Sequence, residues 1–138
     1  MPTVRASVPG AAVVRVVAVG AALVTVAAGL GVRSAGSGDV AKYAGDALYT
    51  VLIHVLVVLL VPRVRPLTAA GAALAFSWAV ELAQLTGVPA DLARQSAVAR
   101  LVLGSTFNAP DLLWYVVGAA LAWAVHSRLP AGRRPARP

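Results

Sequence analysis

The chain has 138 residues, of which 59% are hydrophobic and only 12% are charged, and it contains no cysteine. Soluble domains are about a quarter charged, so this composition predicts a single-domain, all-α integral membrane protein (1–138), and the missing cysteines exclude disulfides and zinc–thiolate sites. The net charge of +7 does not indicate nucleic-acid binding, because the basic residues collect at segment ends and lack an aromatic-rich face.

Four apolar stretches have about the length of a membrane span, for which roughly 20 residues are needed. They predict a four-helix transmembrane bundle with spans at about 11–30, 44–61, 67–85 and 110–125. The first span follows Arg5, and a cleaved signal peptide is the competing interpretation of this segment. The last begins with Pro110 and Asp111, a favourable helix start because proline there loses no needed donor and the carboxylate meets the positive helix end.

The segment between the third and fourth spans, 87–109, is more polar than the spans themselves. Pro89 and Asp91 indicate a helix start, and Leu92 and Leu103 fall on one face, so we expect one short helix that lies at the membrane interface. No internal repeat is visible, which counts against the inverted-repeat plan of many transporters. The segment 128–138, rich in arginine and proline, is expected to be a flexible tail.

The distribution of lysine and arginine predicts the orientation. With four spans, the two ends of the chain and the loop after the second span share one side of the membrane. That side holds eight basic residues, Arg15 included, against four on the other side. Because cytoplasmic segments carry the excess of basic residues, we expect a multi-pass protein of the bacterial plasma membrane with both termini in the cytoplasm.

Three carboxylates in the predicted spans each precede a hydrogen-bonding side chain by about one helical turn. Spacings of three or four residues place both members of a pair on one helix face. Charged groups at membrane depth are costly and usually mark a site, so these pairs predict a polar pocket near the outer surface. The pairs are Asp46 with Tyr49, Glu81 with Gln84, and Asp111 with Tyr115.

Three arginines are expected on the same side of the membrane as these acids. Arginine forks suit phosphate groups, so the leading hypothesis is a pocket that binds a lipid-linked or phosphate-bearing headgroup of a membrane lipid. The spacing of the acids requires no metal, and we expect no cofactor. The candidate ligand-binding residues are Arg33, Asp46, Tyr49, Glu81, Gln84, Arg94, Arg100, Asp111 and Tyr115.

Two alternatives stay open for the same residues. The first is a membrane enzyme that acts on an envelope lipid, with Glu81 or Asp46 as general base and Asp111 as a further catalytic candidate. The second is a structural or accessory subunit, in a homo-oligomer or with another membrane protein, whose acids pair with arginines. A channel or secondary transporter is disfavoured because His54 is the only ionisable residue expected at mid-membrane.

Several motifs together resemble the bacterial membrane proteins called domain of unknown function 2809. Nearly the whole chain apart from its tails shares this resemblance, including Gly31 and Arg33 at the first outer boundary. The motifs are 42–49 (KYAGDALY), 80–85 (VELAQL) and 103–107 (LGSTF), followed by Asp111, Leu112, Leu113 and Tyr115.

A looser resemblance is to VanZ-like proteins, which are linked to low-level teicoplanin resistance. Their Glu-x-x-Gln, the following arginine, and a later Asp and Gly are matched here, but Tyr115 stands where an asparagine is usual. This resemblance implies a role at the cell envelope. The matching positions are Glu81, Gln84, Arg94 or Arg100, Asp111 and Gly118.

Overall fold

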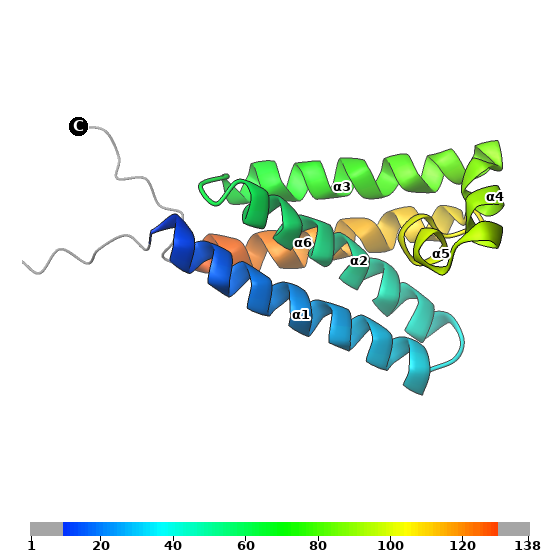
Figure 1. Cartoon of the computed structure of the whole chain (residues 1–138), viewed down its shortest axis with the longest axis horizontal. Coiled ribbons are helices and arrows are strands. Elements are labelled where there is room, and N and C mark those ends of the chain that lie inside the picture. The colour runs from blue at the N-terminus through cyan, green and yellow to red at the C-terminus, as the bar shows by residue number, and fades with distance from the viewer. Residues whose placement is uncertain (1–9, 130–138) are drawn as a thin grey trace, which may run out of the picture.

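The computed structural model describes residues 10–129, and all regular structure in that range is helical (Figure 1). The predicted tail lies outside the described residues from position 130 onward, as does Arg5. The elements are α1 (Ala11–Ala35), α2 (Asp39–Leu60), α3 (Pro66–Ala83), the short 3-10 helix η1 (Gln84–Thr86), α4 (Val88–Gln95), α5 (Ala97–Leu103) and α6 (Ala109–Arg128).

Three segments, α1, α2 and Pro66–Thr86, are long and apolar enough to cross a membrane. They are compatible with the multi-pass membrane protein expected from the composition. The 20-residue helix α6 is outside this set, because Asp111, Tyr115 and His126 lower its mean hydropathy. In Figure 1 the start of α1 and the end of α6 lie at the same end of the molecule.

Glycine and proline set several of the helix ends. The turn between α1 and α2 contains Gly38, whose φ of 89° favours glycine over residues with a side chain. Pro66 occupies the first turn of α3, where a proline costs no helical hydrogen bond. The short turn leaves α1 and α2 side by side, and α2 begins at Asp39, so Lys42 and Asp46 lie in its first two turns.

Helices α2, α3 and α6 pack against one another, and α1 packs on α2 (Figure 1). Small residues fill the interfaces, among them Ala73, Ala119 and Ala122, which let helix backbones approach closely in lipid. The closest approach is at Gly118, where an added Cβ would lie 2.2 Å from the carbonyl oxygen of Ala47. The contact between α2 and α6 therefore depends on the absence of a side chain at position 118.

The single short helix predicted between the third and fourth apolar stretches is wrong, because the structure has two. Helices α4 and α5 are separated by Ser96, whose backbone is extended with φ −148° and ψ 128°. The Ser96 side chain accepts a hydrogen bond from the backbone N–H of Ala99, which starts a new helix. Both short helices lie at one end of the bundle, beside the end of α3 (Figure 1).

Candidate functional site

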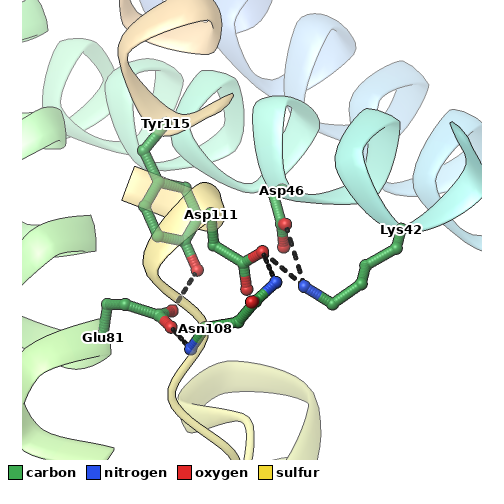
Figure 2. Close-up of polar contacts among 6 residues, drawn as sticks. All are labelled: Lys42, Asp46, Glu81, Asn108, Asp111 and Tyr115. Carbon is green, nitrogen blue, oxygen red and sulfur yellow. Dashed lines mark hydrogen bonds and ion pairs between the residues drawn. The ribbon is translucent and has the colours of Figure 1, made fainter. Parts of the chain in front are cut away.

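The three carboxylates singled out in the sequence come from three helices and lie in one hydrogen-bonded cluster (Figure 2). Asp46 is on α2, Glu81 on α3 and Asp111 on α6. Glu81 is 1% exposed and Asp111 is 4% exposed, so both are nearly sealed inside the bundle. We call the following six residues the acid cluster: Lys42, Asp46, Glu81, Asn108, Asp111 and Tyr115.

Lys42 joins the carboxylates of α2 and α6. Its ammonium group donates a hydrogen bond to Oδ1 of Asp111 and lies 3.8 Å from Oδ2 of Asp46, one helical turn further along α2. The lysine side chain is 45% exposed, whereas the Asp111 side chain is 6% exposed. Lys42 thus connects a buried carboxylate with the surface of the cluster.

Glu81 connects α3 with the beginning of α6. Its Oε1 accepts a hydrogen bond of 2.6 Å from the backbone N–H of Asn108, and its Oε2 accepts one of 2.8 Å from the Tyr115 hydroxyl. Asn108 precedes the first residue of α6, where backbone N–H groups have no partner within the helix. Its side-chain amide donates to Oδ1 of Asp111 at 2.7 Å, so one asparagine links both acids.

One carboxylate oxygen of the cluster is without a hydrogen bond. Oδ2 of Asp46 is buried and has no hydrogen-bond partner among residues 10–129. The Asp46 side chain as a whole is 19% exposed. A buried carboxylate is costly unless it is paired or hydrogen-bonded, and the charge partner of this oxygen is the Lys42 ammonium at 3.8 Å.

The helix-face pairs predicted from the sequence do not bond within themselves. Each pair's hydroxyl or amide donates to another segment: Tyr115 to Glu81, Tyr49 to the Val102 carbonyl at 2.8 Å, and Gln84 to the Leu103 carbonyl at 2.6 Å. The last two hydrogen bonds attach the end of α5 to α2 and η1. The helical spacing thus puts each partner on the expected face, but the tertiary contacts decide what it bonds.

The three predicted arginines lie apart from the acid cluster. Arg94 pairs with Asp91 on the exposed surface of α4, and Arg100 donates to the carbonyl of Ala93 at 3.1 Å. Arg33 is exposed in the last turn of α1. Within the described range, the basic group that contacts the acids is therefore Lys42, which is not among the candidate residues predicted from the sequence.

Two further polar pairs join the same helices. Thr50 and Ser77 share a hydrogen bond of 2.9 Å between α2 and α3, and both are fully buried. Nε2 of His54 lies 3.0 Å from Nδ1 of His126, between α2 and α6. The sequence predicts His54 as the only ionisable residue at mid-membrane, and nothing in it identifies His126 as a partner.

The described residues form no metal-binding site. Among residues 10–129, no group of three or more His, Cys, Asp or Glu side chains is placed to hold a metal ion. The cluster can instead accept hydrogen bonds at Asp46 and present a positive charge at Lys42. Its chemistry therefore suits a ligand that carries both a donor group and an anionic group.

The model of the family described as "Protein of unknown function (DUF2809)" matches residues 36–119. The matched segment contains all six residues of the acid cluster, but it leaves out Gly31, Arg33 and the end of α6. No curated protein and no solved structure matches the chain, so the looser resemblance to VanZ-like proteins stays a prediction. Because the match covers more than half of its residues, the chain belongs to the DUF2809 family.

Proposed function

We propose that the acid cluster binds the polar headgroup of a phosphate-bearing or lipid-linked membrane component. The observation that carries the proposal is the buried Oδ2 of Asp46, which accepts no hydrogen bond within residues 10–129, in an ion pair with the half-exposed Lys42 side chain. A headgroup with a phosphate and an amine or hydroxyl complements both groups at once. Lys42 offers a compact positive charge for the phosphate, and Asp46 accepts the hydrogen bond of the donor.

This proposal changes the residues expected to hold the phosphate. The arginines at 33, 94 and 100 are away from the cluster, so Lys42 takes their role. Glu81 and Asp111 position the site: Glu81 anchors the start of α6, and Asp111 holds the lysine. Both oxygens of Glu81 accept hydrogen bonds, and a general base needs a free acceptor within reach of its substrate, so binding is better supported than catalysis by Glu81.

We further propose that α6 is a fourth span and that α4 and α5 lie at the outer membrane interface. Helix α6 packs against both α2 and α3, as a neighbouring span does. The excess of basic residues on the side of Ala11 and Arg128 favours the cytoplasm for that side. Apolar side chains exposed on or beside α4 and α5 would then contact the outer leaflet: Leu85, Val88, Leu92, Val98, Leu101 and Val102.

Native mass spectrometry of the detergent-purified protein tests the headgroup site. The wild type is expected to retain a phosphate-bearing lipid, and Asp46→Asn and Lys42→Gln are expected to lose it. Asp91→Asn is the matched control, because it makes the same change in an acid that pairs with Arg94 outside the cluster. If all four proteins retain the same mixture of bulk lipids, the headgroup proposal is wrong.

A further inference from the structure

Helix α5 contains no buried residue, whereas the preceding α4 buries Pro89 and Ala93. Its apolar side chains point outward, with Val98 69% exposed and Leu101 54% exposed. A helix of seven residues is too short to be stable by itself, and segments with few buried contacts are those that open locally in folded proteins. Helix α5 therefore depends on its polar contacts to stay in place.

Two side chains of the bundle hold the C-terminal end of α5. The Tyr49 hydroxyl of α2 donates to the carbonyl of Val102 at 2.8 Å. Nε2 of Gln84, in η1, donates to the carbonyl of Leu103 at 2.6 Å. Carbonyl groups in the last turn of a helix have no partner within that helix, so both are free to accept these bonds. We call Tyr49 and Gln84 the latch of α5.

The latch lies on two sides of the buried hydrogen bond between Tyr115 and Glu81. Gln84 follows Glu81 by three residues at the end of α3. The ring of Tyr49 lies beside the ring of Tyr115, with centroids 6.1 Å apart, and Tyr115 donates to Glu81. Because α5 is held from both sides of this pair, its C-terminal end closes over Glu81, which is 1% exposed.

Helix α5 lies between two breaks in the helical backbone. Ser96 is extended before its first residue, and Gly104 follows its last residue with a φ of 64°, which favours glycine. An added Cβ at Gly104 would lie 2.6 Å from Nε2 of Gln84, so a side chain there would displace the latch. Arg100 ties α5 to the Ala93 carbonyl of α4 rather than to the bundle.

We propose that α5 is a lid over Glu81, which opens at these two breaks while α2, α3 and α6 stay packed. Opening breaks the two latch hydrogen bonds and removes no buried side chain of α5 from its contacts. The closed latch is also incompletely satisfied, because Oε1 of Gln84 is buried and accepts no hydrogen bond within residues 10–129. Such an oxygen makes the closed state less stable.

An open lid gives the acid cluster a second entrance, on the side away from Lys42. Val98 and Leu101 border it, on the surface that the proposed orientation places at the outer leaflet. A headgroup that leaves the leaflet would therefore pass α5 to reach the cluster. This role in headgroup entry rests on the function proposed above, whereas the opening of α5 does not.

Carbodiimide labelling of Glu81 measures the opening directly. The full chain in detergent micelles is incubated with a water-soluble carbodiimide and glycine ethyl ester, and amide formation at Glu81 is followed by peptide mass spectrometry. Tyr49→Phe removes one latch hydrogen bond, and Gly104→Ala displaces the other. Each variant is expected to label Glu81 about 2- to 10-fold faster than the wild type, the range that loss of one hydrogen bond gives.

The matched control is Tyr43→Phe, which makes the same change in a tyrosine of α2 that stacks on Trp114 of α6. It is expected to label Glu81 at the wild-type rate. Hydrogen exchange gives a second readout: amides of α5 are expected to exchange faster in both latch variants, whereas those in the middle of α2 are expected to keep the wild-type rate. A general loosening of the bundle would accelerate both.

Two results would overturn the proposal. One is equal labelling of Glu81 in the wild type and in the folded latch variants. The other needs no variant: amides of wild-type α5 that exchange as slowly as those in the middle of α2. Because neither readout requires a lipid, the lid is tested separately from lipid retention, and a protein that retains no specific lipid but labels as expected has the lid without the headgroup site.

Discussion

The hydrogen bond from Tyr115 to Glu81 is expected to stabilise the bundle by an amount that a double-mutant cycle can measure. Tyr115→Phe removes only the hydroxyl that donates to Oε2 at 2.8 Å. Glu81→Ala removes the acceptor and also leaves the N–H of Asn108 without a partner. The cycle isolates the pairwise energy because the second loss is common to both arms that carry Glu81→Ala.

The size of this coupling free energy is bounded by two ranges known for hydrogen bonds. Hydrogen bonds to a charged group contribute about 1.5–3 kcal/mol in proteins, whereas those between membrane helices average about 0.6 and reach about 1.7 kcal/mol. Glu81 is 1% exposed and each of its oxygens already accepts one hydrogen bond, so water competes little for the Tyr115 hydroxyl. We therefore expect a coupling free energy near the upper membrane value, about 1.5 kcal/mol.

Unfolding in mixed micelles, titrated with a denaturing detergent, gives the free energies of the wild type, the two single variants and the double variant. The control cycle combines Glu81→Ala with Tyr49→Phe, because the Tyr49 hydroxyl donates to the Val102 carbonyl instead. That control is expected to show additivity within about 0.5 kcal/mol. A Tyr115–Glu81 coupling no larger than the control would refute the stabilising role given to the Tyr115–Glu81 hydrogen bond.

Three other predictions concern packing, a helix start and topology. Gly118→Ala is expected to lower the free energy of unfolding by about 1–3 kcal/mol, because the new methyl group meets the backbone of α2. Its control in the same assay is Gly71→Ala, because a methyl group at position 71 meets only open space. Ser96→Ala removes the cap of α5 at a cost of about 1 kcal/mol, which hydrogen exchange would detect as faster exchange in the first turn of α5. In this cysteine-free chain, Arg94→Cys and Arg128→Cys are expected to react with an impermeant maleimide from opposite sides of the membrane, and labelling from one side would contradict the proposed orientation.

The helices were predictable from the sequence because long apolar stretches of α1, α2 and α3 have few alternatives in lipid. The positions of the acids on their helices were also predictable from a local spacing. Their bonding partners were not, since Glu81 bonds residues 27 and 34 positions away, and no periodicity within one helix reports such contacts.

Two other features could be recognised only from the three-dimensional structure. In the sequence, Ser96 fits equally well within a helix or at a helix N-cap. In the structure it is the N-cap of α5, so the one expected helix is divided into two. His54 looked isolated along the chain because His126, its neighbour in space, is 72 residues away. A sequence pattern therefore located the polar residues but did not show which of them contact each other across helices.

The two donors to Glu81 have a consequence for how the chain is made. Both of them come from residues that are synthesised after α3, the later one 34 residues after Glu81. At about 5–20 residues per second, the ribosome reaches it roughly 2 to 7 seconds later. During that interval the Glu81 carboxyl group of the newly made α3 is without the two donors that it has in the finished bundle.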